Sequence, residues 1–400
     1  MRVLYLSWTG LAEPLGRSQV LAYLKLLSAN HEISLLTMEK SEDLADSQLM
    51  GTLQAICKEH GIEWKFRRYH RHPRLLARAF DFLVFLGRAI MEARRFRPQL
   101  VHGRAYIASF VASIVARTRS IPFIFDMRAL WPEELVVSGR LRSGSFMHKM
   151  IVSIERRLLV PSAGIVSLTQ AAVKHLTNLH PNIPPSKLVV IPTCADLTVF
   201  RPRQRAQPSS PSSIGSVGSI TSGWFKLPWL MGFLAAARRA DSGLRFTIVS
   251  RDDERAIRAA AAEVGLREND IKTFACSPED VPAALADLDV LVMFFVAGVS
   301  KLASCPTRMA EALATGIPIV TNEGVGDVAA VIRDNRVGVL VESDSCKAMH
   351  AAYLQLLELM KDPNLSHRCR SVAENLFSVE SGAATYGKLY QSATTYTSQL

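Results

Sequence analysis

Residues 305–327 read CPTRMAEALATGIPIVTNEGVGD, and this stretch combines the signals of a helix, a strand and a turn. Pro306 suits the first turn of a helix and Gly316 suits the residue just past its end, so we expect a short helix over 306–315. The apolar IPIV then reads as a buried strand, and the glycines of TNEGVGD permit close backbone approach to a ligand. Helix, strand and glycine turn in this order favour an α/β fold.

The same alternation extends over the rest of the chain. Strand candidates RVLYLS, EISLLTM, QLVHGR and IPFIFDMR alternate with segments whose apolar residues have helical spacing. SIGSVGS, LRFTIVS, IKTFAC and LDVLVMFF repeat the pattern in the second half. Strands that alternate with helices are typical of a parallel sheet with helices on both faces. We therefore predict two doubly wound, Rossmann-like domains that face a central cleft.

The domain boundaries follow from length and composition. A chain of 400 residues is too long for one compact core. FRPRQRAQPSSPSS (200–213) is rich in Pro, Ser and Arg and has no periodicity, which indicates a linker. We expect a first domain over 1–199 and a second over 214–374. Residues 375–400 should form a helix that packs back on the first domain.

Composition excludes several classes of protein. With 48% hydrophobic and 21% charged residues, the chain is globular and not disordered. Its six cysteines are scattered, without a CxxC pair or a histidine at metal spacing, so we expect reduced thiols and no structural zinc. No apolar run reaches the roughly 20 residues that span a bilayer. These features predict a cytoplasmic protein.

The formal net charge of +11 includes one basic stretch, KFRRYHRHPRLLARAF (65–80), without any acid. Its cations are Lys65, Arg67, Arg68, Arg71, Arg74 and Arg78. Such a stretch can bind anionic lipid or nucleic acid, or it can be a solvated loop and helix face. No nucleic-acid motif accompanies it. We therefore predict an anionic membrane surface as partner, at the inner face of the cytoplasmic membrane, and no nucleic acid.

Arg308 and Glu311 lie three residues apart on the expected 306–315 helix. They can form an ordinary surface ion pair, or they can bind one ligand between them. A cation in the first turn opposes the helix dipole, whereas an anion bound there would satisfy both the arginine and the free backbone N–H groups. A phosphate near Arg308 and a ribose near Glu311 would together describe a nucleotide.

Other candidate residues lie in loops that follow predicted strands, where doubly wound sheets bind their ligands. GSVGSITSGWFK (215–226) offers amides and hydroxyls to phosphate, Lys226 as a cation, and Trp224 as a ring that can stack on a base or simply pack. Its glycine spacing is not that of a dinucleotide fingerprint. In GLAEPLGRSQV (10–20), Gly16 lets a ligand come close.

FDMRALWPEE (125–134) places Asp126 and Arg128 at the end of a buried strand candidate. A charged pair at this edge of a sheet is either a catalytic group or a structural anchor. The residues alone leave both alternatives open.

Several of these stretches carry a family resemblance. PTRMAEALATGIPIV resembles the PTK-x-x-E-x-x-A-x-G-x-P-V segment of the retaining, nucleotide-sugar-dependent GT-B glycosyltransferases of family 4. GSITSGWF and TNEGVGD are similar to two loops of that family, G-S-L-G-T-W-Y and N-x-G-x-G-D. EPLGRSQVLAYL resembles the D-P-L-G-Q-S-Q-V-L-P-Y-L opening of related bacterial polysaccharide enzymes. The match touches most of the chain and keeps its order.

The resemblance implies the GT-B fold and an enzyme that moves a sugar from a nucleoside diphosphate, UDP or GDP, to a glycan or lipid-linked glycan. It implies retention of configuration, a role in surface polysaccharide biosynthesis, and neither metal nor other cofactor. Glu311 would hold the ribose, and Arg308 the diphosphate where the family usually has lysine. The implied donor-binding set is Gly16, Ser219, Thr221, Trp224, Lys226, Thr307, Arg308 and Glu311.

Two positions depart from the family pattern. Ala303 replaces the first glutamate of the E-x7-E motif, and Arg128 stands where many relatives have a histidine. Arginine cannot act as a base, but it can orient a hydroxyl while Asp126 holds it. In this fold the leaving diphosphate can itself take the acceptor proton, so the enzyme mainly stabilises departing charge. We therefore predict Asp126 and Arg128 as the catalytic residues.

Three alternatives stay open. An epimerase of nucleotide sugars on the same fold would use Asp126 with Glu133 or Glu134 as acid and base. A nucleic-acid-binding module would explain the charge. A catalytically silent partner subunit would explain the departures at Arg128 and Ala303.

Overall fold

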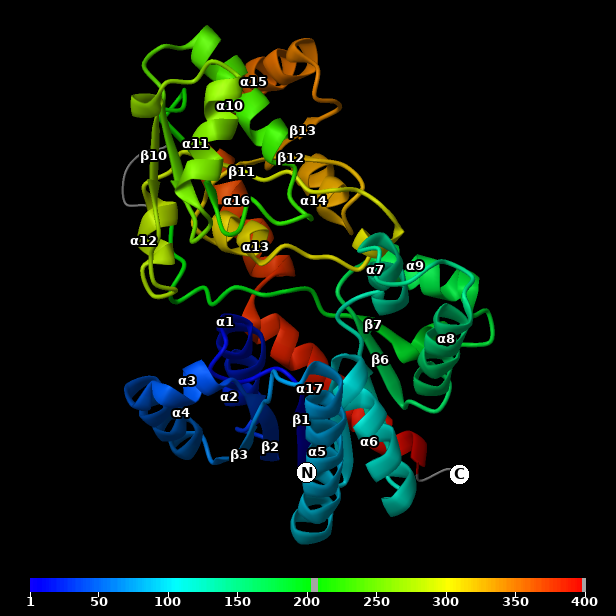
Figure 1. Cartoon of the computed structure of the whole chain (residues 1–400). Helices are drawn as coiled ribbons and strands as arrows, with labels where there is room; N and C mark the ends of the chain where they lie inside the picture. Colours follow the sequence, from blue (N-terminus) through cyan, green and yellow to red (C-terminus); the bar gives the residue numbers. More distant parts are fainter. Residues whose placement is uncertain (203–207, 398–400) are drawn as a thin grey trace. The chain divides into compact units, whose positions relative to one another are not determined.

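The computed structural model describes residues 1–202 and 208–397, which fold into two compact units (Figure 1). The first unit combines Met1–Pro192 with the segment that starts at Val379, and the second comprises Thr193–Ser378. Each unit contains its own parallel sheet. Within the described ranges, no helix is long and apolar enough to cross a membrane.

The first unit is built on a seven-stranded sheet with the order β3-β2-β1-β4-β5-β6-β7. All of its strand pairs are parallel. The strand order reverses between β1 and β4, so the loops after these two strands leave the sheet at neighbouring places. The strands are β1 (Arg2–Ser7), β2 (Glu32–Glu39), β3 (Ile62–Arg68), β4 (Leu100–Arg104), β5 (Phe123–Asp126), β6 (Gly164–Ser167) and β7 (Leu188–Val190).

Helices cover both faces of this sheet. Among them, α5 packs beside α6 and α6 beside α8, while the C-terminal helix α17 packs against α2 (Figure 1). Side-chain caps fix several starts, as at α4, α8 and α9, where Asp46, Ser145 and Thr169 accept backbone N–H groups. The helices are α1 (Pro14–Gly16), α2 (Ala22–Leu27), α3 (Ser41–Ala45), α4 (Ser47–Glu59), α5 (Arg74–Phe96), α6 (Ala105–Arg119), α7 (Trp131–Val137), α8 (Phe146–Leu159), α9 (Gln170–Leu179) and α17 (Val379–Thr397).

The second unit repeats this plan with six parallel strands in the order β10-β9-β8-β11-β12-β13. Its strands are β8 (Ser213–Val217), β9 (Arg245–Val249), β10 (Ile271–Phe274), β11 (Val290–Val292), β12 (Ile319–Asn322) and β13 (Gly338–Val341). Its helices are α10 (Leu227–Ala240), α11 (Glu254–Glu263), α12 (Val281–Ala286), α13 (Thr307–Ala314), α14 (Val328–Asn335), α15 (Cys346–Met360) and α16 (Leu365–Leu376). The two sheets confirm the predicted α/β fold with two Rossmann-like domains.

The chain enters the second unit earlier than the sequence predicted. Thr193 Oγ1 donates to the Cys305 carbonyl at 2.9 Å, and Ala195 N donates to the Phe377 carbonyl at 2.8 Å. These bonds assign the end of the predicted first domain to the second unit, and they join segments more than 100 residues apart. Within the predicted linker, residues 203–207 lie outside the described residues.

A buried carboxyl, that of Glu155, joins α8 to α6. Its Oε1 lies 2.5 Å from the Tyr106 hydroxyl, and that hydroxyl also lies 3.0 Å from the Ala129 carbonyl oxygen. A tyrosine hydroxyl has one proton, so both contacts are hydrogen bonds only if a protonated Glu155 donates to Tyr106 while Tyr106 donates to the Ala129 carbonyl. Burial raises the pKa of Glu155 to about 7, against the opposing effect of the Tyr106 bond. Glu155 is therefore protonated in the folded protein below neutral pH.

This proton makes stability depend on pH. The pKa of Glu155 is raised from 4.5 to about 7 on folding, so its contribution is present below pH 4.5 and is lost as the pH rises through 7. The shift corresponds to about 3 kcal/mol of unfolding free energy. Glu155→Gln keeps a donor without a titrating proton. Urea unfolding at pH 5 and pH 8 should show a smaller loss of stability in this variant than in wild type, and equal losses would contradict the assignment.

Candidate functional site

Loops from β8 and β11 form one structure at the carboxyl edge of the second sheet. These are the strands at which the strand order reverses, the usual ligand position in such sheets. Lys226 N donates to the Phe294 carbonyl at 2.9 Å, and Val296 N donates to the Trp224 carbonyl at 3.0 Å. The two loops therefore run antiparallel beside each other and can present their side chains together.

The side chain of Asn322 fixes the β11 loop from the end of β12. Its Oδ1 accepts from Phe295 N at 2.8 Å, and its Nδ2 donates to the Phe295 carbonyl at 2.9 Å. Asn322 is only 3% exposed, so its side-chain amide is shielded from water. At the adjacent Gly324, with φ of +86°, a Cβ would collide with the Ala297 Cβ. The glycine turn is thus needed for close packing of two loops.

Helix α13 follows the β11 loop in the chain and contains Arg308 and Glu311, the pair predicted to bind a nucleotide. It covers Thr307–Ala314, with Pro306 at the N-cap and Gly316 in the left-handed region at φ +76°. Arg308 Nη1 donates to the Glu311 carboxylate, so the structure contains the ion pair that the dipole argument disfavoured.

The exposures of this pair differ. The Glu311 side chain is 7% exposed and the Arg308 side chain 34% exposed. The Glu311 carboxylate therefore lies inside the unit, and Arg308 lies nearer the surface. Burial raises the pKa of Glu311, and the Arg308 charge offsets only part of that rise. Arg308 has five N–H donors, so the pair leaves some of them for another anion.

The loop after β8 is organised around Asp252, which follows β9. The Asp252 carboxylate accepts from Ser219 Oγ at 2.9 Å, Ile220 N at 2.6 Å and Thr221 N at 2.8 Å. Burial alone would raise the pKa of Asp252, but these hydrogen bonds outweigh it and lower the pKa. The loop amides and the Ser219 hydroxyl, which were predicted to bind a phosphate, thus donate to the Asp252 carboxylate instead.

Two lysines flank the tryptophans of this region. Lys301 Nζ lies 3.6 Å from the centre of the Trp224 ring, and Lys226 Nζ lies 3.7 Å from that of Trp229. Both are cation–π contacts. Lys301 also accepts, through its carbonyl, a hydrogen bond from Gly326 N at 2.9 Å. The sequence reasoning missed Lys301, although it precedes the PTRMAEAL segment by only a few residues.

In the first unit, buried Glu39 shapes the loop that contains Gly16. Its carboxylate accepts from Leu11 N at 2.6 Å and from Ala12 N at 3.1 Å. A Cβ at Gly16 would collide with the Gly10 carbonyl oxygen, so this glycine is required for packing within the loop. Its predicted contact with a donor stays a prediction.

Asp126 and Arg128 connect β5 to the C-terminal helix. Arg128 Nε donates to Asp126 Oδ2 at 3.0 Å and Nη2 donates to the Tyr386 hydroxyl at 2.7 Å. The Tyr386 hydroxyl donates to Asp126 Oδ2 at 3.0 Å. Burial would raise the pKa of Asp126, but the Arg128 guanidinium more than compensates and lowers it. These contacts match the structural-anchor alternative, and the catalytic assignment stays a prediction.

His102 extends this anchor and was missed from the sequence. Its Nδ1 lies 2.7 Å from the Tyr390 hydroxyl and its Nε2 lies 3.3 Å from Asp126 Oδ2. Burial lowers the pKa of His102 despite the neighbouring carboxylate. Together the residues fix α17 to the sheet of the first unit.

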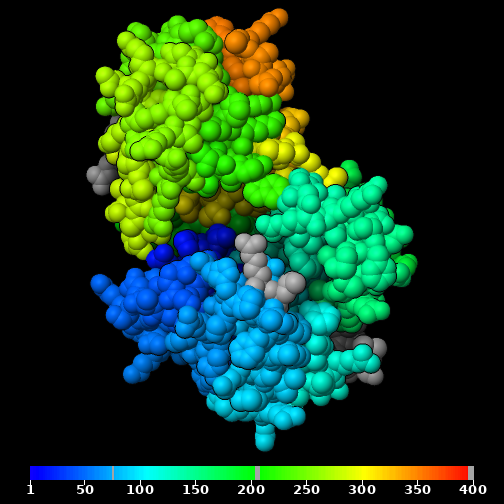
Figure 2. Space-filling model, viewed as in Figure 1, coloured from blue at the N-terminus to red at the C-terminus, as the bar shows by residue number. Residues whose placement is uncertain are grey.

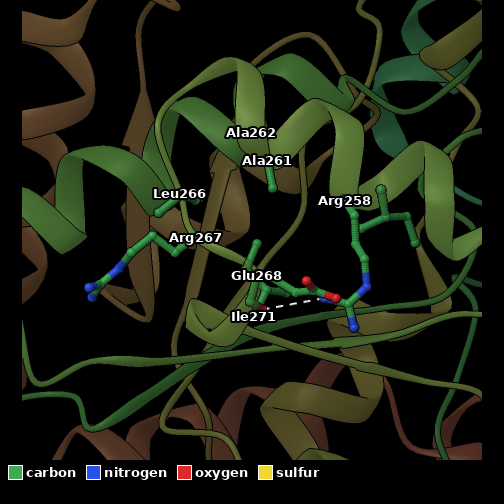
Figure 3. A pocket seen from close by; sticks show the side chains of 8 residues that line it. Arg258, Ala261, Ala262, Leu266, Arg267, Glu268 and Ile271 are labelled. Carbon is green, nitrogen blue, oxygen red and sulfur yellow. Dashed lines mark hydrogen bonds and ion pairs between the residues drawn. The ribbon is translucent and has the colours of Figure 1, made fainter.

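A hollow of about 260 Å³ lies elsewhere on the second unit (Figure 3). Arg258 borders it and approaches Glu268 at 3.4 Å. None of the predicted donor-binding residues lines it. The lining residues are Ile257, Arg258, Ala261, Ala262, Leu266, Arg267, Glu268 and Ile271. In the part of the chain that the structure describes, no group of three or more His, Cys, Asp or Glu side chains is placed to hold a metal ion.

Comparison with known families identifies both units. Residues 18–194 match the family model described as glycosyl transferase 4-like domain, and residues 211–359 match the one described as glycosyl transferases group 1. Together these segments cover most of the chain. The chain belongs to the GT4-type glycosyltransferases. This GT4-type chain is 26% identical over 298 residues to a D-inositol 3-phosphate glycosyltransferase of Segniliparus rotundus. The aligned segment covers 72% of this chain and 64% of that relative, so the chain spans less than two thirds of the relative's length.

Solved structures share the fold of the GT4-type chain. Anabaena HepE in complex with UDP and glucose superimposes with a TM-score of 0.71 at 14% identity, over 98% of this chain and 100% of HepE. A Listeria monocytogenes protein assigned as a UDP-N-acetylglucosamine 2-epimerase superimposes with a TM-score of 0.61 at 12% identity, over 96% of this chain and 94% of that one. Similarity at these identities concerns the fold alone.

The Asn322 bridge gives a testable expectation for the GT4-type chain. Asn322→Ala leaves the partly buried N–H and carbonyl of Phe295 without their side-chain partner, at a cost of about 3 kcal/mol. The midpoint of urea unfolding of the second unit should fall accordingly. Asn335→Ala, which removes one bond to the Val331 carbonyl at the end of α14, is the control and should cost about 1 kcal/mol. Equal effects of the two variants would contradict the bridge.

Proposed function

We propose that this chain is a glycosyltransferase that moves a sugar from a nucleoside diphosphate, UDP or GDP, to a glycan or lipid-linked glycan. The proposal includes retention of configuration and a role in surface polysaccharide biosynthesis. The observation that carries it is the Arg308–Glu311 pair in the first turns of α13, beside the point where the strand order of the second sheet reverses. The segment lies inside the matched glycosyl transferases group 1 region.

Two kinds of group in this pair suit the two ends of a nucleotide. The partly exposed Arg308 guanidinium can donate to diphosphate oxygens, and the free N–H groups at the start of α13 add positive potential for the same anion. The Glu311 carboxylate can accept hydrogen bonds from ribose hydroxyls. Thr307 adds a hydroxyl at the first residue of the helix.

The other residues of the proposed donor site either add positive charge or shape the loop after β8. Lys301 adds positive charge beside Trp224, whose ring is available to a base as well as to Lys301, and Lys226 adds positive charge beside Trp229. Asp252 holds Ser219 and Thr221, so we assign these two residues to the shape of the loop. In the first unit, Gly16 belongs to the proposal as a residue that would let the transferred sugar come close.

The chemistry follows from this distribution of charge. The bond between the sugar C1 and the diphosphate oxygen breaks, a bond from C1 to the acceptor oxygen forms, and the diphosphate takes the acceptor proton. Arg308 stabilises the charge that develops on the leaving diphosphate, aided by the nearby lysines, so this route requires no metal. Asp126 and Arg128 complete the proposal as catalytic residues. Arg128 Nη1, which lacks a hydrogen-bond partner among the described residues, can orient a substrate hydroxyl.

An epimerase acting on nucleotide sugars is the second candidate, because the Listeria protein assigned to that activity shares the fold. It requires an acid and a base that exchange protons. Arg128 lowers the pKa of Asp126, which opposes an acid role, and leaves Glu133 and Glu134 of α7 as candidates.

Nucleotide binding tests the proposal. UDP or GDP at about 100 times its dissociation constant should raise the melting temperature by roughly 5–10 °C. Arg308→Ala and Glu311→Gln should each remove most of that shift, while Arg308→Lys should keep part of it because lysine retains the charge.

Arg258→Ala is the control for these variants. It breaks an ion pair with Glu254 on α11, away from α13, and should leave the nucleotide-induced shift intact. An unchanged shift in Arg308→Ala, or no shift with any nucleotide in wild type, would contradict the proposed site.

A further inference from the structure

Three neighbouring helices of the first unit have an unusual distribution of charge. Helices α5, α6 and α8 pack side by side and form the blue-cyan to green-cyan surface of this unit in Figure 2. Their sequences contain five, two and three Lys or Arg residues respectively. They contain only three acids, Asp81, Glu92 and Glu155, and all three are buried.

The three buried acids form hydrogen bonds with other groups of the protein. Asp81 accepts from His70 N at 2.7 Å, Glu92 accepts from Ser34 Oγ at 2.9 Å, and Glu155 contacts Tyr106. The outer face of the three helices therefore presents only basic and neutral groups among its described side chains. Among the described side chains of the three helices, Arg95 is the one basic residue that an ion pair joins to an acid, whereas Arg78 and Arg88 form none.

Large apolar side chains lie among these cations. Leu76, Phe80, Leu83 and Met91 are exposed at helical spacing along α5, with Leu83 65% exposed. On α8, Phe146 is 81% exposed, and Met147 and Met150 are exposed beside it. A run of exposed apolar residues of this extent marks an interaction surface, because monomers rarely leave it in water.

The structure moves the membrane contact away from most of the cations of the predicted stretch, residues 65–80. Lys65 pairs with Glu92 at 2.5 Å, and Arg71 pairs with Glu42. Arg68 donates to Ser41 Oγ at 2.9 Å. These cations at the edge strand β3 and its loop are therefore already paired with acids or hydrogen-bonded to a hydroxyl. Arg67 Nη1 donates to the Phe66 carbonyl at 2.8 Å. The side chain of Arg74 lies outside the described residues, which leaves Arg78 of the predicted set on the outer face.

We propose that the outer face of α5, α6 and α8 is a docking surface for a bilayer that contains anionic lipid. Interfacial binding needs an apolar stripe that enters the acyl boundary and cations that reach the headgroups, and this face supplies both. A nucleic acid would use the cations, but would gain little from exposed leucine and methionine. The inference deepens the proposed function, since a lipid-linked acceptor is met at such a surface.

Vesicle flotation tests this surface. The full-length protein should float with vesicles of phosphatidylcholine and phosphatidylglycerol, weakly with phosphatidylcholine alone, and less as salt rises. Arg88→Gln should weaken binding about fivefold, as expected for one cation near an anionic leaflet. Leu83→Ser should weaken binding by a similar factor or more, because it removes an apolar side chain from the interface.

Matched controls lie on the second unit. Leu354→Ser replaces a leucine of α15 that is half exposed, and Arg255→Gln replaces an exposed arginine of α11. Both should bind vesicles as wild type does. Melting temperatures should confirm that all four variants fold.

Several outcomes would overturn the docking surface. These are equal binding to neutral vesicles, wild-type binding by Arg88→Gln and Leu83→Ser, equal loss in the controls, or retention of an oligonucleotide instead of vesicles. The UDP-induced melting shift, measured on the same variants, separates the two proposals. A retained shift with failed flotation rejects only the surface, whereas flotation without any nucleotide shift rejects only the proposed donor site.

Discussion

The two hydrogen bonds between the Asn322 amide and the Phe295 backbone hold the candidate donor site together. They attach the loop after β11 to the end of β12, and that loop in turn pairs with the loop after β8. Because the parallel strands begin their loops at one edge of the sheet, a single buried amide can order two of these loops beside α13. Arg308 and Glu311 lie on α13, which packs against α16 and β12.

The sequence predicted the parts that depend on local signals. Alternating strand and helix patterns predicted both sheets, and Pro306 with Gly316 predicted α13 to within one residue at each end. It could not predict which side chains satisfy which backbone groups. Asp252 binds amides about 30 residues away, and Asp126 binds Tyr386, 260 residues away. The chain crossing at Thr193 was missed for the same reason, since it depends on a distant contact with Cys305.

The two units differ in how their positive charge is distributed. The net charge of +11 is not evenly spread, because α5, α6 and α8 bury their acids and expose their arginines and lysines. The second unit instead places a few cations at one sheet edge, where Lys226, Lys301 and Arg308 lie close to aromatic rings or to a carboxylate. A broad basic and apolar face suits a lipid surface, whereas a small cationic edge suits a diphosphate. The lipid surface and the diphosphate site therefore rest on different groups of residues.

A crystal structure of the protein grown with UDP is the sharpest test of the proposed donor site. The diphosphate should lie within hydrogen-bond distance of the Arg308 guanidinium and of the first N–H groups of α13, with the ribose hydroxyls on Glu311. UDP bound in the hollow beside α11, or at any place where Arg308 and Glu311 keep only each other as partners, would contradict it.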